Sequence, residues 1–95
     1  MRDLAELRQE LDQLDRELVA LFERRMAVSR EVAQYKLAHG LPVLDASREA
    51  QVIASREAML ADPTLAPALR ALFDAILALS REAQETILKE ARGDA

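Results

Sequence analysis

One heptad pattern runs through the first 35 residues, and it constrains the fold more than any other feature. Apolar side chains recur at alternating steps of three and four residues, with Arg25 in one place of the series; the apolar members are Leu4, Leu7, Leu11, Leu14, Leu18, Leu21, Val28, Val32 and Tyr35. This stripe predicts one long amphipathic helix over residues 3–38. Gly40 and Pro42 end it, because glycine favours the left-handed C-terminal position and proline cannot continue a helix.

Two further helices are predicted in the rest of the chain. Asp45 is a typical N-cap residue, which indicates a second helix over 46–61 that Asp62-Pro63 closes. A third helix is predicted over 65–91, since Pro67 is tolerated only in a first turn. Leu, Ala, Glu and Arg dominate between the breaks, and no segment is typical of a strand. The predicted fold class is all-α, as a single domain over residues 1–95.

The first helix is too long for the rest of the chain to cover. A 36-residue helix extends about 54 Å, whereas a compact globule of 95 residues would measure about 30 Å across. An uncovered leucine stripe would be a large exposed apolar patch. We therefore expect an intertwined homodimer in which the long helices pack on both chains. A plain two-stranded coiled coil with a helical appendage is the alternative.

Composition excludes several classes of function. The sequence has no cysteine, one histidine and three aromatic residues, which argues against disulfide scaffolds, thiolate metal sites and base-stacking platforms. A net charge of −4 disfavours a nucleic-acid binder. No uninterrupted apolar run has the roughly 20 residues of a membrane span, and the charged N-terminus is unlike a signal peptide. We expect a cytoplasmic protein with no metal and no cofactor.

Polar residues interrupt the apolar faces of the first and third helices. Arg25, Ser29, Val32 and Lys36 share one face of the first helix, so the two cations could bracket a small anionic ligand. Arg25 could equally pair with a carboxylate of a partner chain. Arg8 lies about 25 Å from Arg25 along the helix, and the two could meet one ligand only if a second chain supplied one of them. Taken alone, Arg8 is typical of a solvated surface residue.

Ser80 and Gln84 interrupt the third helix in the same way. Uncharged polar groups on an apolar face either hydrogen-bond within the core or face a wet pocket. Asp45, Arg48 and Glu49 cluster at the start of the second helix, where acidic residues also favour the helix dipole. Together these side chains would suit a small dianion that carries a hydroxyl group.

The ordered set of segments resembles the all-helical chorismate mutases over nearly the whole chain. The polar members are separated by 17, 11, 9, 3, 1, 31 and 4 residues; they are Arg8, Arg25, Lys36, Asp45, Arg48, Glu49, Ser80 and Gln84. The segments around them are Leu7-Arg8, Leu14-Asp15, Glu23-Arg24-Arg25, Lys36-Leu37, Pro42-Val43-Leu44-Asp45, Arg48-Glu49 and Leu72-Phe73. The resemblance implies an intertwined dimer that rearranges chorismate to prephenate, on the way to phenylalanine and tyrosine, without a metal or cofactor.

The resemblance also implies a role for each residue. Arg25 and the partner chain's Arg8 would clamp the substrate carboxylates. Lys36 would reach both a carboxylate and the ether oxygen, and Gln84 would donate to that same oxygen. Glu49, assisted by Asp45, would accept from the ring hydroxyl. Arg48 and Ser80 would support the carboxylate contacts.

Two other functions stay open at this point. An isochorismate–pyruvate lyase on the same scaffold would share the arginines, the lysine and the glutamine. A catalytically silent helical dimerisation or regulatory module would have no need of Lys36 and Gln84 on apolar faces. The sequence leaves open an association or fusion with another pathway enzyme.

Overall fold

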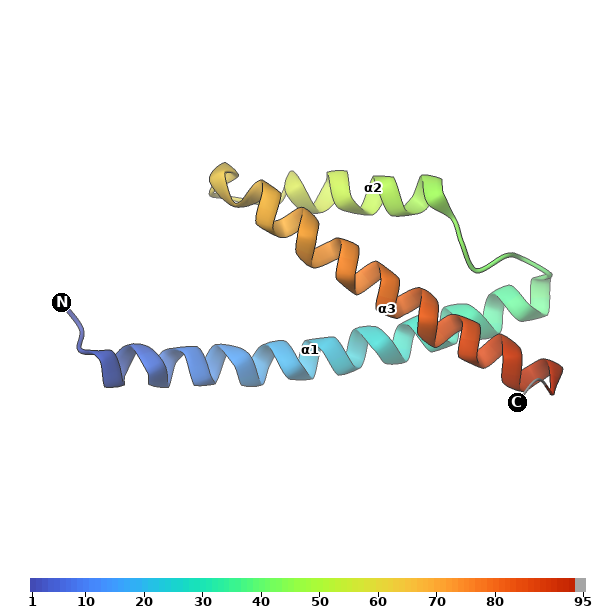
Figure 1. The fold of residues 1–95 in the computed structure, drawn as a ribbon, viewed down its shortest axis with the longest axis horizontal. Coiled ribbons are helices and arrows are strands. Elements are labelled where there is room, and N and C mark those ends of the chain that lie inside the picture. The colour runs from blue at the N-terminus through green and yellow to red at the C-terminus, as the bar shows by residue number, and fades with distance from the viewer. Residues whose placement is uncertain (94–95) are drawn as a thin grey trace.

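The fold is all helical, as predicted. A computed structural model describes residues 1–93, and their elements in chain order are α1 (Leu4–His39), α2 (Ala46–Glu57), the short 3₁₀ helix η1 (Pro63–Leu65) and α3 (Ala66–Arg92). These residues contain no strand. Figure 1 shows α1 as a long rod that α3 crosses near its C-terminal end, with α2 lying beside α3.

Both ends of α1 are capped, and its C-terminal end lies at Gly40 as the sequence predicts. The Asp3 carboxylate accepts a hydrogen bond from the Glu6 backbone N–H at 2.8 Å. At the other end Gly40 adopts a left-handed conformation with φ 64°. The Leu41 N–H donates to the Lys36 carbonyl at 2.8 Å, and the Gly40 N–H to that of Leu37 at 3.4 Å. This is the Schellman arrangement, and it turns the chain toward α2.

The second helix is shorter than the sequence predicts. We expected it to continue to residue 61, but α2 ends at Glu57. Beyond this point the Met59 and Leu60 N–H groups bond three residues back, to Arg56 and Glu57, as 3₁₀ turns do. These tighter turns belong to the reversal that leads into η1 and then α3. Pro67 falls in the first turn of α3, as expected.

The helices pack through a small contact region. Where α1 faces α3, Ala33 is completely buried, and Val43, Val52 and Leu77 are the other buried apolar residues among those described. A side chain as small as alanine allows two helices to approach closely. The core of one chain is therefore confined to the C-terminal half of α1 and the faces of α2 and α3 above it.

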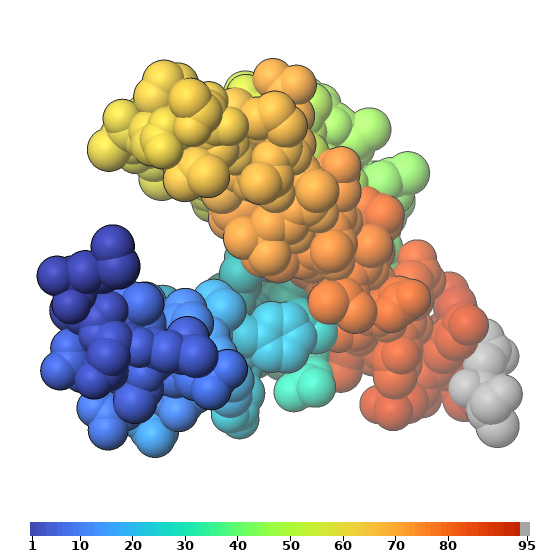
Figure 2. Space-filling model, turned by 60° about the vertical axis from the view of Figure 1, so that its left-hand side comes forward, coloured from blue at the N-terminus to red at the C-terminus, as the bar shows by residue number. Residues whose placement is uncertain are grey.

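The N-terminal half of α1 extends clear of the other helices. The molecule measures 56 × 26 × 17 Å with a radius of gyration of 17.0 Å, against about 12 Å for a compact globule of this length. Figure 2 shows open space between this half of α1, in blue, and the start of α3, in orange. The apolar stripe is exposed along it: Leu11, Leu14 and Leu18 are each more than half exposed.

Among the described residues, one helical segment is long and apolar enough to cross a membrane by length and composition alone. This segment is Pro63–Arg92. Its most apolar stretch of 18 residues has a mean hydropathy of 1.3, and 11% of that stretch is buried. The core helix of a water-soluble assembly meets the same criteria, so one such helix is weak support for a span. Our expectation that the chain does not enter a membrane stays a prediction.

Candidate active site

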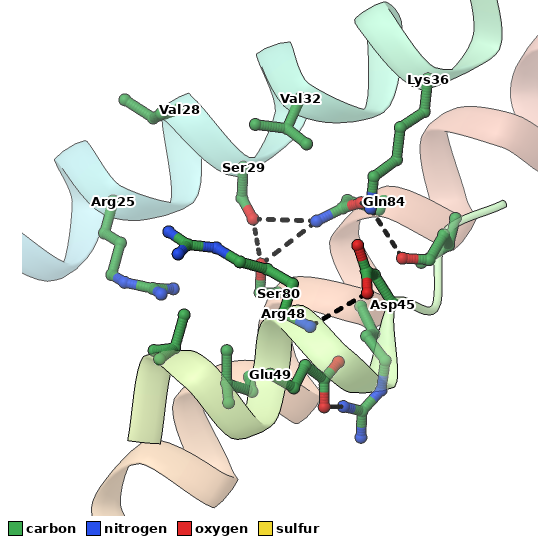
Figure 3. A pocket seen from close by; sticks show the side chains of 14 residues that line it. Arg25, Val28, Ser29, Val32, Lys36, Asp45, Arg48, Glu49, Ser80 and Gln84 are labelled. Atoms are coloured by element: carbon green, nitrogen blue, oxygen red, sulfur yellow. Dashed lines mark hydrogen bonds and ion pairs between the residues drawn. The ribbon is translucent and has the colours of Figure 1, made fainter. Parts of the chain in front are cut away.

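A pocket of about 270 Å³ lies where the three long helices meet (Figure 3). Seven of the eight candidate site residues line it: Arg25, Lys36, Asp45, Arg48, Glu49, Ser80 and Gln84. They come from α1, from the α1–α2 connection and from α2 and α3. The structure therefore brings together side chains that are up to 59 residues apart in the sequence.

The α1 wall of the pocket is the face that the spacing predicts. Arg25, Ser29, Val32 and Lys36 all line the cavity, and they follow one another at helical steps of four, three and four residues. Figure 3 shows Arg25 at one end of this wall and Lys36 at the other.

The Lys36 ammonium group connects three parts of the fold. Its Nζ donates to the Val43 carbonyl oxygen at 2.7 Å and to Gln84 Oε1 at 3.1 Å. The first bond ties the α1–α2 connection to α1, and the second joins α1 to α3. An ammonium group has three donors, so one N–H remains for a ligand after these two bonds.

Gln84 and two serines form the buried polar floor of the pocket. Each of Ser29, Ser80 and Gln84 is 7% exposed. The two hydroxyl groups hydrogen-bond each other, and Gln84 Nε2 lies 3.4 Å from both oxygens. Because the amide oxygen accepts from Lys36, its NH₂ must face the serines. The sequence left open whether Ser80 and Gln84 hydrogen-bond within the core or face a pocket. In the structure they do both.

Asp45 begins α2 as its N-cap. Its Oδ1 accepts from the Arg48 backbone N–H at 3.0 Å, and the other carboxylate oxygen has no hydrogen bond within the described residues. The Arg48 side chain donates to Gln51 Oε1 at 2.9 Å. Within the described residues Arg48 forms no ion pair with a carboxylate. A local ion pair therefore does not account for an arginine at this position.

The pocket is positively charged within a negatively charged chain. Four cations and two carboxylates line it, although the chain carries a net charge of −4. Burial lowers the pKa of Arg25, and the positive charges of Arg56 and Arg48 lower it further. No carboxylate among the described residues pairs with Arg25. An anion bound here would relieve the repulsion between these guanidinium groups.

Arg81 is a pocket residue that the sequence analysis missed. It lies on α3 next to Ser80, lines the cavity, and its Nη1 donates to Glu49 Oε1 on α2. Nothing in the spacing of 32 residues between Glu49 and Arg81 predicts the pair, because it depends on how α2 packs against α3. The apolar part of the lining, Val28, Val43, Val52 and Leu77, was also not predicted as such.

Arg8 does not reach this pocket within one chain. It lies in the N-terminal part of α1, which extends away from α2 and α3 (Figure 1), and it is exposed. Its place in a site therefore requires a second chain, as the sequence analysis stated.

These geometric features define what the pocket can do. Its cations and hydrogen-bond donors, set against apolar walls, can bind and orient a small polyanion. No group of three His, Asp or Glu side chains within residues 1–93 is arranged to hold a metal ion. The side chains that line the pocket can interact with a ligand through charge and hydrogen bonds.

Comparison with known proteins decides the family. The model of the family "Chorismate mutase type II" matches residues 7–85, a range that includes all eight candidate residues. The chain belongs to this family. The family resemblance seen in the sequence is thereby confirmed.

Two curated relatives match a shorter part of this chorismate mutase type II chain. The T-protein of Haemophilus influenzae (strain ATCC 51907 / DSM 11121 / KW20 / Rd) is 41% identical over 56 residues, 59% of this chain and 15% of the relative. The T-protein of Enterobacter agglomerans is 37% identical over 54 residues, 57% and 14% respectively. The matches thus cover about one seventh of each relative's length. No solved structure matches this chain significantly.

Proposed function

We propose that this chain catalyses the rearrangement of chorismate to prephenate. The observation that carries the proposal is the contact of Lys36 Nζ with the Gln84 amide, at 3.1 Å, inside a pocket with an excess of cations. The reaction is an intramolecular pericyclic shift, so it needs no nucleophile and no general base. It needs a site that selects one conformer of a flexible dianion and stabilises charge as the ether bond breaks.

The arginines supply the first requirement. Arg25 and Arg48 line the cavity without carboxylate partners among the described residues. A guanidinium group binds a carboxylate through two parallel N–H donors. Arg25 clamps one substrate carboxylate, and Arg48 with Ser80 supports the carboxylate contacts, which holds the two reacting ends together.

Lys36 and Gln84 supply the second requirement. Negative charge grows on the ether oxygen as its bond lengthens, so donors aimed at that oxygen bind the transition state better than the substrate. Lys36 has one N–H left after its two bonds. The Gln84 NH₂ makes only two long contacts of 3.4 Å, which a better acceptor can replace.

Two carboxylates on α2 suit the substrate hydroxyl. An ionised carboxylate is an acceptor only, and Glu49 and Asp45 each keep an oxygen that no hydrogen bond within residues 1–93 occupies. Glu49 accepts from the ring hydroxyl, and Asp45 assists from the start of α2. This contact orients the ring relative to the carboxylate clamp.

A homodimer completes the site in this proposal. The exposed leucine stripe of α1 packs against a second copy, and an antiparallel arrangement brings the partner subunit's Arg8 to the pocket. Two chains of 95 residues then form two equivalent sites, and each site contains one arginine from the other chain. The cytoplasmic location and an association with another pathway enzyme stay predictions.

The test is a turnover assay with chorismate on the wild type, Lys36→Ala, Arg8→Ala and Lys89→Ala. Lys89 is the only other lysine of the sequence and lies outside the pocket, so Lys89→Ala is the matched control. We expect prephenate from the wild type and the control, and a loss of about 100-fold or more in the other two variants. Full activity in Lys36→Ala and Arg8→Ala would contradict the mechanism.

A parallel assay with isochorismate separates the two rival functions. An isochorismate–pyruvate lyase would release salicylate and pyruvate from isochorismate faster than it forms prephenate. A silent helical module would turn over neither substrate, and Lys36→Ala would change only its stability. Prephenate as the dominant product rejects both.

A further inference from the structure

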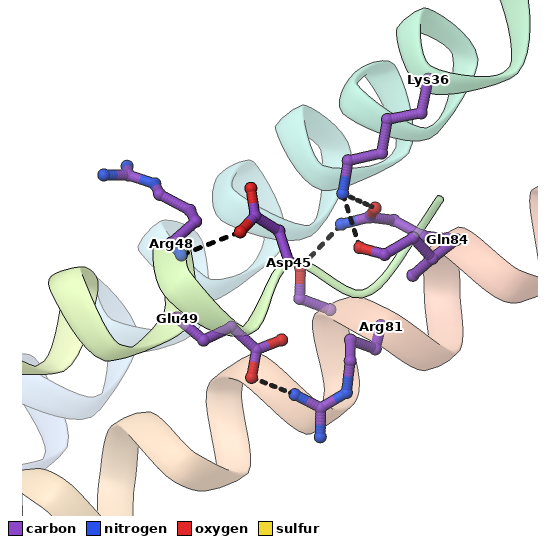
Figure 4. A network of polar contacts seen from close by, with 8 residues as sticks. Lys36, Asp45, Arg48, Glu49, Arg81 and Gln84 are labelled. Carbon is purple, nitrogen blue, oxygen red and sulfur yellow. Dashed lines mark hydrogen bonds and ion pairs between the residues drawn. The ribbon is translucent and has the colours of Figure 1, made fainter. Parts of the chain in front are cut away.

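Two ion pairs join α2 to α3, and only one of them lies in the pocket. Arg81 pairs with Glu49 at the cavity, and Arg70 pairs with Glu57 near the other end of α2. The Glu49 and Glu57 side chains have the same exposure, 23%. Figure 4 shows the Arg81 side chain extending from α3 toward Glu49, with a dashed line between the guanidinium group and the carboxylate.

The Arg81 contact fixes how Glu49 presents its carboxylate. Arg81 Nη1 donates to Oε1, so this oxygen faces α3 while Oε2 has no hydrogen bond within the described residues. A carboxylate held by one oxygen keeps the other as an acceptor in a defined direction. Glutamate otherwise has three rotatable side-chain bonds, and a single ligand contact would have to order all of them.

Arg81 also keeps Glu49 away from the other cations of the pocket. Lys36, Arg25 and Arg48 line the same cavity, and an unpaired carboxylate on α2 would be attracted to them. Such a contact would occupy a cation that a substrate carboxylate requires. Pairing with Arg81 satisfies the Glu49 charge on the α3 side and leaves the remaining cations available.

We propose that Arg81 is a positioning residue, which acts through Glu49 to orient the acceptor for the substrate hydroxyl. The inference rests on the proposed function. It extends that function by a residue that contacts no reacting atom. The alternative is that the Arg81–Glu49 pair only connects α2 with α3. The Arg70–Glu57 pair makes such a connection outside the pocket and therefore serves as the comparison.

The experiment compares Arg81→Met with Arg70→Met, Arg81→Lys, Glu49→Gln and the double variant Arg81→Met/Glu49→Gln. For each we measure kcat and KM for chorismate and the midpoint of thermal unfolding. Arg81→Met is expected to lower kcat/KM about tenfold, mainly by raising KM, because the hydroxyl contact exists in the bound substrate as well as in the transition state. Arg81→Lys restores part of this loss, and Arg70→Met leaves kcat/KM unchanged.

The double variant tests whether Arg81 acts through Glu49. If it does, Arg81→Met causes no further loss in the Glu49→Gln background, since the group that it positions is already replaced. Additive losses of kcat/KM in the double variant would overturn the inference. Equal effects of Arg81→Met and Arg70→Met on kcat/KM would also overturn it. In both cases the wild type would still form prephenate, so the proposed function would stand. A wild type that forms no prephenate would overturn the proposed function and the inference with it.

Discussion

Lys36 Nζ donates to Gln84 Oε1 across 3.1 Å, and this contact orients the Gln84 amide. An ammonium group can only donate, so the amide oxygen must face Lys36 and the NH₂ must face Ser29 and Ser80. The donors that we assign to the ether oxygen are therefore held next to each other before any ligand arrives. Such preorganisation costs little reorganisation during the reaction.

The first prediction replaces Gln84 by glutamate. At pH 8 the new carboxyl group would be ionised, because the neighbouring Lys36 ammonium favours its charged form. An ionised carboxylate cannot donate, so we expect kcat/KM at pH 8 to fall about 100-fold. Activity should rise as the pH falls and the carboxyl group becomes protonated, whereas the wild type needs no acidic pH.

A pH profile of kcat/KM for the wild type, Gln84→Glu and Gln13→Glu checks this prediction. Gln13 is exposed on α1 and lies outside the pocket, so its variant controls for the added negative charge. Rates like those of the wild type for Gln84→Glu at pH 8 would remove the donor role of Gln84.

The second prediction concerns the chain that supplies Arg8. Arg8→Ala and Lys36→Ala should each be inactive alone. If Arg8 acts across a two-fold dimer, each mixed dimer has one intact site, and an equal mixture after refolding recovers about a quarter of the wild-type activity. The measurement is prephenate formation before and after the two variants are unfolded and refolded together. A mixture that stays inactive would show that Arg8 does not act on the partner's site.

The sequence predicted what local chemistry controls. The end of α1 follows from Gly40, the start of α2 from Asp45, and the pocket wall of α1 from the spacing of Arg25 and Lys36. The residues on α2 and α3 were assigned roles only through the family resemblance, since no local pattern relates them. The contact of Glu49 with Arg81 depends on the packing of two helices, and the early end of α2 at Glu57 depends on the reversal into η1.

The third prediction tests the contact between α1 and α3. Ala33 is fully buried where α1 faces α3, and Ala33→Leu adds atoms where there is no room. We expect the free energy of unfolding to fall by about 1–3 kcal/mol. Ala38→Leu, at an exposed position of the same helix, should change it little. Urea unfolding at a fixed protein concentration compares the two variants, and equal midpoints would mean that the crossing is looser than the structure has it.

The last prediction tests the dimer through Leu14. In a single chain this side chain is 51% exposed, so Leu14→Glu would cost a monomer very little. In a dimer the same change places a charge within the leucine stripe and leaves it buried without a partner. Sedimentation velocity should therefore show a shift from dimer to monomer for Leu14→Glu, together with a lower unfolding temperature, because association no longer stabilises the folded chain. Gln9→Glu, off the stripe on the same helix, is the control and should stay dimeric. A wild type that sediments as a monomer at all concentrations would leave the exposed stripe without the proposed partner and would reject the shared site.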